Sequence, residues 1–210
     1  EGLYEDQKQG EKVKVTCTKS NEGFATAGGV QYVACAGNFK DAGLEYTGAL
    51  KVLQMIFSYE YLWIQIRVKG GAYGCMCSFS DQGDSMFVTY RDPNLSESYK
   101  VYDEAADYVV DFDADDRDMK KYIIGTIGSM DMPMEAVDMG ARSFHAYFLD
   151  KTEADLQKVR DQVLSCTQED IRALAPIVKA VVEAGNRCCI GNEEKIDQNK
   201  EYFDEVKHVL

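Results

Sequence analysis

The amino-acid sequence predicts an α+β domain in which a mainly antiparallel β-sheet carries helices on one face. Strand-like alternation and glycine turns are concentrated in the first ninety residues, whereas apolar residues at helical spacing dominate the rest, before one strand pattern returns. This order of elements is typical of α+β architecture. No repeat or composition break divides the chain, so we expect residues 13–210 to form a single domain, preceded by a linker from an earlier domain at residues 1–12.

The N-terminal part is expected to supply most of the sheet. Residues 13–17 alternate apolar and polar side chains as a half-buried strand does, and residues 30–35, closed by Gly37 and Asn38, predict a second strand. Residues 46 to about 63 predict a long buried helix, because Leu50, Leu53, Phe57 and Tyr61 recur at helical spacing.

Two further strands follow the break at Gly70 and Gly71. Residues 72–79 and 85–90 are predicted to pair as a hairpin, because Asp81-Gln82-Gly83-Asp84 between them has turn composition.

The C-terminal part is expected to be mostly helical. Thr152 with Asp155, and Thr167 with Asp170, each resemble an N-cap with an acid three residues on. The helix that begins after Thr167 is expected to be kinked or interrupted at Pro176. The remaining predicted elements are helices over residues 101–112, 119–127 and 140–149, a strand at 188–190 and a terminal helix over 193–206.

Composition and charge exclude several classes of function. Hydrophobic residues make up 45% of the chain and charged residues 28%, which is ordinary for a globular protein and unlike a disordered one. The 36 acidic residues exceed the 23 basic ones, giving a net charge of −13, so nucleic acid is a poor partner. Strictly apolar runs are far shorter than the roughly 20 residues that a membrane helix needs, so no membrane partner is expected.

Cysteine usage favours a reducing compartment. The chain has seven cysteines, an odd number, and most lie in apolar runs where free cysteine acts as a small hydrophobic residue. We therefore expect a cytoplasmic protein without structural disulfides. The chain begins at Glu1 with no visible targeting signal, and we expect it to be part of a longer protein.

Metal and thiol sites have weak support. The two histidines, His145 and His208, lack zinc-binding spacing, and no metal ligand set is predicted in this chain. The pairs Cys75-Cys77 and Cys188-Cys189 leave open a soft-metal or thiol protein, although Cys75 and Cys77 share one face of a predicted strand, as two small core residues would. A cysteine–histidine nucleophile pair also stays open.

The acidic run from Asp111 to Asp118 invites a calcium interpretation. An EF-hand loop starting at Asp111 needs glycine at its sixth position and glutamate at its twelfth, where this chain has Asp116 and Tyr122. We therefore expect a solvated turn whose acids favour the N-terminus of the following helix.

One stretch combines features of a site. It reads Arg67-Val-Lys-Gly-Gly-Ala-Tyr73-Gly74: a helix ends in a basic pair, a double glycine follows, and a strand opens with an aromatic residue. The structural interpretation is a helix C-cap with favourable cations, leading into a hairpin. The functional interpretation places Arg67 and Tyr73 on one rim, where both donate hydrogen bonds to peptide carbonyls or to a developing oxyanion.

This stretch resembles a signature in the C-terminal half of insulinase-type (pitrilysin family) zinc metallopeptidases, and in particular of their presequence-protease branch. Four further segments resemble the same branch, and the similarity extends over roughly residues 13–206. They are Gly37-Asn38 after the strand predicted at residues 30–35, Tyr90-Arg91-Asp92-Pro93-Asn94-Leu95, Lys121-Tyr-Ile-Ile-Gly-Thr-Ile-Gly128 and residues 152–161.

The resemblance implies the fourth, C-terminal domain of a peptidase that closes around peptide substrates, with a metallohydrolase-like fold. It implies that zinc is bound by an N-terminal domain of the same protein, and that this fragment alone is inactive. It also implies that Tyr73 donates to the scissile carbonyl oxygen and that Arg67 holds substrate carbonyls. The alternative is a catalytically inert structural or docking domain of the same fold.

Overall fold

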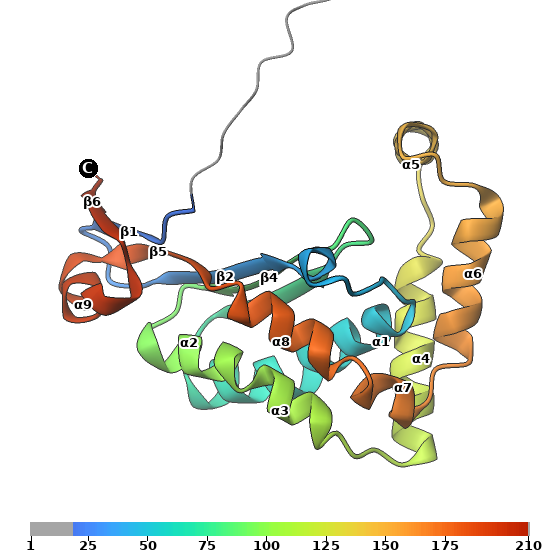
Figure 1. The fold of residues 1–210 in the computed structure, drawn as a ribbon, viewed down its shortest axis with the longest axis horizontal. Coiled ribbons are helices and arrows are strands. Elements are labelled where there is room, and N and C mark those ends of the chain that lie inside the picture. Colours follow the sequence, from blue (N-terminus) through green and yellow to red (C-terminus); the bar gives the residue numbers. More distant parts are fainter. Residues whose placement is uncertain (1–18, 210) are drawn as a thin grey trace, which may run out of the picture.

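The computed structural model describes residues 19–209 (Figure 1). The predicted linker at residues 1–12 and the strand predicted at residues 13–17 lie outside the described residues.

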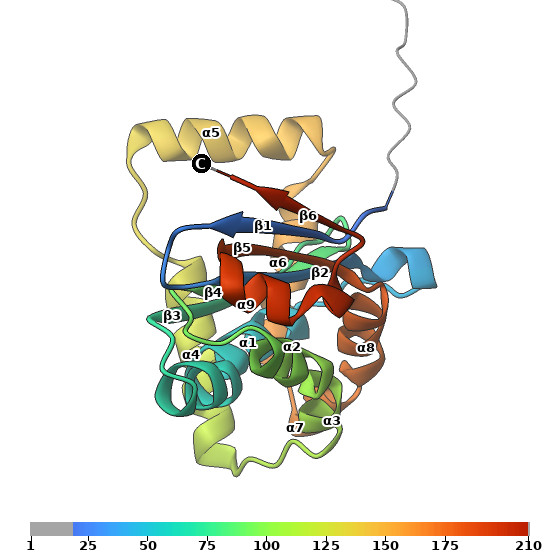
Figure 2. The same cartoon turned by 90° about the vertical axis from the view of Figure 1, so that its left-hand side faces the viewer.

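One six-stranded sheet organises the described chain, in the order β3-β4-β2-β5-β1-β6 (Figure 2). The strands are β1 (Glu22–Thr26), β2 (Tyr32–Asn38), β3 (Gly74–Phe79), β4 (Asp84–Tyr90), β5 (Asn186–Asn192) and β6 (Glu205–His208). Strands β3, β4, β2 and β5 pair antiparallel, whereas β1 lies parallel to both β5 and β6. The prediction of a mainly antiparallel sheet is therefore wrong, because the observed sheet is mixed.

The sheet differs from the prediction because the chain end packs against β1. The terminal helix predicted over residues 193–206 stops early: α9 (Glu193–Gln198) gives way to a 3₁₀ turn, η4 (Lys200–Tyr202), and then to β6. A Cβ atom built on Gly23 of β1 would lie 3.0 Å from side-chain atoms of both Ile196 and Phe203. The missing side chain at Gly23 thus gives these residues room to pack, and this long-range contact overrides the local helical spacing.

Helices cover one face of the sheet (Figure 1). They are α1 (Ala49–Ile56), α2 (Ser96–Asp103), α3 (Ala105–Val110) and α8 (Ala175–Glu183). The core between the layers is aromatic and aliphatic, and Phe57, Phe87 and Tyr102 are fully buried in it. The Tyr102 hydroxyl donates a 3.1 Å hydrogen bond to the carbonyl oxygen of Val33, so its burial leaves no polar atom unpaired.

The predicted helix caps are confirmed. Thr152 and Thr167 each form a capping box with the acid three residues on, opening α6 (Glu153–Leu164) and α7 (Gln168–Arg172). The helix predicted after Thr167 is interrupted as expected: α7 ends before α8, whose first turn holds Pro176, where proline removes no helical hydrogen bond.

The acidic run is a helix-opening turn, as predicted. Asp115 caps α4 (Asp116–Met130) by accepting hydrogen bonds from the backbone nitrogens of Arg117 and Asp118, each 2.9 Å long.

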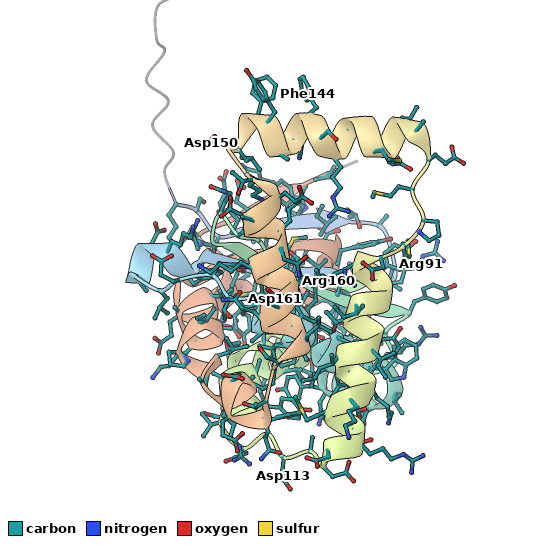
Figure 3. All side chains as sticks on the ribbon, turned by 90° about the vertical axis from the view of Figure 1, so that its right-hand side faces the viewer. Arg91, Asp113, Phe144, Asp150, Arg160 and Asp161 are labelled. Atoms are coloured by element: carbon teal, nitrogen blue, oxygen red, sulfur yellow. The ribbon has the colours of Figure 1, made fainter. Side chains whose placement is uncertain are left out.

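An isolated helix stands apart from the rest. Helix α5 (Ala136–Phe148) has no buried residue and lies on the opposite side of the sheet from the helical layer (Figure 1). Figure 3 shows Phe144 pointing away from the body of the protein. Between the two helices that flank α5 in the sequence, Arg160 of α6 pairs with Asp131 at the end of α4, with one N–O distance of 2.7 Å. Within residues 19–209, no helix has the length and apolar character needed to cross a membrane.

Candidate functional site

Arg67 and Tyr73 lie on either side of one turn between a helix and a strand. The helix is longer than predicted, because α1 continues as two π-helical segments, η2 (Phe57–Tyr61) and η3 (Trp63–Lys69). In the last turn the Gly70 nitrogen donates to the Gln65 carbonyl oxygen over 3.0 Å, which is the i to i−5 bond of a π-helix. π-Helical segments are rare in proteins overall, and those that occur are often found at functional sites.

The two glycines are both needed for this turn. A Cβ atom on Gly70 would lie 2.5 Å from the carbonyl oxygen of Ile66, closer than any side chain can approach. Gly71 has a φ of +82°, which favours glycine. The chain therefore reverses direction within two residues and places Tyr73 directly beside the helix end.

A second segment braces the turn from behind. The side-chain amide of Asn94 donates a 2.7 Å hydrogen bond to the Gly70 carbonyl oxygen, and the Tyr73 nitrogen donates to the Arg91 carbonyl oxygen over 3.3 Å. Gly74 pairs with Tyr90 in the β3–β4 ladder. The two stretches whose sequences resemble the presequence-protease branch, residues 67–74 and 90–95, are therefore in direct contact.

A buried carboxylate anchors this brace. Asp92 is fully buried and accepts hydrogen bonds from the Ser98 hydroxyl at 2.6 Å and from the Asn94 nitrogen at 2.9 Å. Burial raises the pKa of the Asp92 carboxyl above its ordinary value, although these hydrogen bonds oppose the rise. The carboxylate fixes Asn94, and Asn94 in turn fixes the Gly70 carbonyl.

The structure brings Arg67 and Tyr73 together on one rim. The guanidinium carbon of Arg67 lies 5.7 Å from the centre of the Tyr73 ring and 4.1 Å from the centre of the Trp63 ring. The cation therefore stacks on an aromatic face, an arrangement that orients a guanidinium while leaving its N–H groups available. Tyr73 is 66% exposed, so its hydroxyl is accessible to a ligand.

A cleft of about 500 Å³ opens beside this pair, between the π-helical segments and α4. Its lining includes Tyr59 and Trp63 from the π-helical segments, Cys75 from β3 and Met130 from α4. Burial raises the pKa of the Cys75 thiol to about 11, against the opposing effect of the Arg67 cation. Trp63, on which the Arg67 guanidinium stacks, also lines the cleft, so the rim and the cleft are contiguous.

The structure does not favour a thiol or metal site. Burial raises the pKa of Cys35 to about 11 and of Cys189 to about 12, whereas a nucleophilic cysteine needs a lowered pKa. Cys75 and Cys77 share the inner face of β3, as predicted. Cys188 and Cys189 are consecutive on β5, so their side chains point to opposite faces.

The described residues do not fit a zinc ion. Among residues 19–209, no three His, Cys, Asp or Glu side chains are grouped to hold a metal. His145 is exposed on α5, and His208 lies 3.2 Å from a carboxylate oxygen of Glu193.

Sequence reasoning missed two supports of this site. Trp63 precedes Arg67 by four residues on a helix, and this spacing alone could have identified the stacking partner. Asn94 is 24 residues from Gly70, and no local pattern signals their contact.

Comparison with known proteins shows what the chain is similar to. Residues 21–192 match the family model of the PreP C-terminal domain. The chain is 43% identical over 192 residues to Protein HypA of Clostridium perfringens, covering 91% of this chain and 20% of that protein. It is 33% identical over 194 residues to presequence protease 1, chloroplastic/mitochondrial, of Arabidopsis thaliana, covering 90% of this chain and 18% of that protein. The chain thus spans about a fifth of the length of these curated relatives.

Solved structures share the fold at low sequence identity. The peptidase M16 inactive domain from Pseudomonas fluorescens superimposes with a TM-score of 0.60 at 16% identity, covering 83% of this chain and 44% of that one. The inactive peptidase domain of a putative zinc protease from Bordetella parapertussis gives a TM-score of 0.59 at 16% identity, covering 78% of this chain and 92% of that one.

Proposed function

The chain belongs to the presequence-protease C-terminal domain family, and from this premise we propose that it supplies Arg67 and Tyr73 to bind the substrate of a peptidase whose metal site lies elsewhere in the full-length protein. The observation that carries the proposal is the placement of both side chains on one accessible rim, 5.7 Å apart and held by a turn that Asn94 braces.

The two side chains have different roles in this proposal. The Tyr73 hydroxyl donates a hydrogen bond to the carbonyl oxygen of the peptide bond that breaks, where negative charge develops. The Arg67 guanidinium presents several N–H donors in a fixed plane and holds neighbouring main-chain carbonyls of the substrate. Because Trp63 stacks on the guanidinium before substrate arrives, little reorganisation is needed on binding.

The remaining parts of the proposal concern the whole protein. Zinc, the metal expected for this family, is proposed to be bound by the N-terminal domains; among residues 19–209 no group of side chains fits it. Peptides are the substrates, and those N-terminal domains are the physical partners with which this domain encloses them. The location is proposed to be cytoplasmic, although the Arabidopsis relative is named as chloroplastic/mitochondrial.

The test uses the full-length protein with Tyr73→Phe or Arg67→Ala. Each change is expected to lower kcat/KM for a peptide by tens- to hundreds-fold, because loss of one donor to an oxyanion typically costs about 3 kcal/mol. Tyr147→Phe, on exposed α5, is the matched control and should leave kinetics unchanged. Bound zinc should remain at the wild-type level in every variant.

Unchanged kinetics in both variants would remove Arg67 and Tyr73 from the mechanism. The inert structural or docking domain would then be the better interpretation of the fold.

A further inference from the structure

The end of strand β4 carries one extra residue beside the candidate site. Ala34 pairs with Val88 in the β2–β4 ladder, and Gln31 pairs with Asp92 just beyond it. Two residues separate Gln31 from Ala34, whereas three separate Val88 from Asp92. This is the arrangement of a β-bulge, which re-aims a side chain and is frequent next to active sites.

Arg91 lies in this bulge with a backbone conformation that favours glycine. Its φ is +48°, and within residues 19–209 only Asp150 among the other non-glycine residues has a positive φ. A bulge with a left-handed residue normally has glycine at that position, because a side chain there is strained. The Arg91 side chain therefore costs conformational energy, and residues held in this way cluster at functional sites.

The Arg91 guanidinium contacts Tyr90, the residue before it. Its central carbon lies 5.6 Å from the centre of the Tyr90 ring. Tyr32 of β2 contacts the same ring edge to face, with the ring centres 5.5 Å apart. Arg91 and Tyr32 together restrict the Tyr90 ring, although the side chain is partly exposed.

Tyr90 in turn contacts Tyr73. Their ring centres are 5.8 Å apart and their planes are 64° apart, the edge-to-face geometry that aromatic pairs prefer. Gly74 is the residue that pairs with Tyr90 in β3, and a Cβ atom built on it would lie 3.7 Å from the Tyr90 Cβ atom. Because Gly74 has no side chain, nothing at this position separates the Tyr73 ring from Tyr90.

Tyr73 needs such support because 66% of it is exposed. A tyrosine side chain can occupy several rotamers, whereas a donor to a developing oxyanion must be preorganised. The Tyr90 ring and the Arg67 guanidinium, whose central carbon lies 5.7 Å from the Tyr73 ring centre, both restrict this freedom before substrate binds.

We propose that Tyr90 is a positioning residue for Tyr73, and that the left-handed Arg91 keeps Tyr90 in place. The Tyr90 ring fixes the orientation in which the Tyr73 hydroxyl meets the carbonyl oxygen of the peptide bond that breaks. The proposal rests on the proposed function of Tyr73, and it goes beyond that function by assigning the orientation of the donor to β4 and its bulge.

The experiment measures kcat and KM of the full-length enzyme on one peptide substrate. Tyr90→Ala removes the ring and Tyr90→Phe keeps it. Met86→Ala is the matched control, because Met86 is an exposed residue on the same face of β4, four residues before Tyr90. A urea titration of each variant reports its stability.

Tyr90→Ala is expected to lower kcat about tenfold with little change in KM. The Tyr73 hydrogen bond is made to charge that develops in the transition state, and a small misplacement of such a donor has a large kinetic effect. Tyr90→Phe and Met86→Ala should retain the wild-type kcat.

A double-mutant cycle separates positioning from a structural role. Tyr73→Phe has no hydroxyl, so adding Tyr90→Ala to it should lower kcat less than about twofold further, because no donor remains to be positioned. A further loss of about tenfold in that background would assign Tyr90 a structural role and overturn the proposal. A wild-type kcat in Tyr90→Ala alone would also overturn it.

Arg91→Gly tests the proposal without straining the backbone. Glycine adopts a φ of +48° readily, so the bulge should persist and the urea midpoint should not fall. The kcat is nevertheless expected to fall severalfold, because the Tyr90 ring loses its contact with the cation. A wild-type kcat in this variant would overturn the role of Arg91.

Tyr73→Phe alone reports on the proposed function. A wild-type kcat in that variant would reject the role of Tyr73 and, with it, the positioning role of Tyr90. A lowered kcat in Tyr73→Phe together with a wild-type kcat in Tyr90→Ala would retain the proposed function and reject only the positioning role.

Discussion

The side-chain amide of Asn94 donates a 2.7 Å hydrogen bond to the carbonyl oxygen of Gly70, and this bond joins the β4–α2 connection to the turn that carries the candidate site. The same connection accepts the Tyr73 nitrogen at Arg91. The orientation of Arg67 relative to Tyr73 therefore depends on Asn94, which lies 24 residues from Gly70 in the sequence.

Asn94→Ala is expected to lower kcat/KM of the full-length enzyme by about tenfold, because small misplacements of binding groups have large kinetic effects. Asn199→Ala is the matched control: its amide makes a similar 2.8 Å bond to the Lys195 carbonyl oxygen, far along the chain from the turn. Each change should lower unfolding free energy by about 1 kcal/mol. Equal kinetics in the two variants would show that the brace has no part in activity.

Gly71→Ala is expected to lower the free energy of unfolding by about 1–2 kcal/mol, because Gly71 has a φ of +82° that an alanine adopts only with strain. The space itself is adequate, since the nearest atom, of Pro93, would lie 3.6 Å from the new Cβ atom. Gly128→Ala in α4 is the opposite case, with no neighbour within 4 Å, and should stabilise by about 0.5–1 kcal/mol. Denaturant titration of both variants checks the sign.

The raised pKa of Asp92 predicts how the free energy of unfolding changes with pH. Burial raises this pKa in the folded state above the ordinary value of 3.8. As pH rises above that value, the unfolded chain loses the proton before the folded protein does. The free energy of unfolding therefore falls with rising pH until the pH exceeds the folded-state pKa. Asp92→Asn removes this titration. Its stability relative to the wild type should therefore improve between about pH 3.5 and neutral pH in urea titrations. A stability difference between Asp92→Asn and the wild type that does not change with pH would show that the pKa of Asp92 is not raised by folding.

Local patterns predicted the elements that local interactions decide. The capping boxes at Thr152 and Thr167, the acidic turn capped by Asp115 and the interruption near Pro176 each depend on residues within one helical turn. The double glycine was recognised for the same reason, since its turn is formed by adjacent residues.

The features that were missed depend on contacts between distant residues. Strand β6 exists because Gly23 gives Ile196 and Phe203 room to pack, and β1 pairs parallel with strands from the other end of the chain. Tyr90 of β4 and Tyr32 of β2 likewise become neighbours only through strand order, which the residue spacing does not contain.

The cysteines are expected to behave as core residues. Burial raises the pKa of Cys166 and Cys189 to about 12, so very little thiolate is present near neutral pH. In a Cys17→Ser background, which removes the one cysteine outside the described residues, a disulfide-exchange reagent should react only after denaturation. Rapid reaction of a folded thiol would revive the thiol hypothesis, and a cysteine-by-cysteine series would then identify it.

The net charge of −13 predicts that salt weakens the binding of basic peptides. An acidic chain attracts a cationic substrate over a distance that salt shortens, from about 14 Å at about 0.05 M to about 4 Å at about 0.5 M. KM of the full-length enzyme for a lysine-rich peptide should therefore rise severalfold across this range. A neutral peptide of equal length should keep its KM, because only the electrostatic contribution is screened. A constant KM for the lysine-rich peptide would mean that the acidic surface has no part in substrate capture.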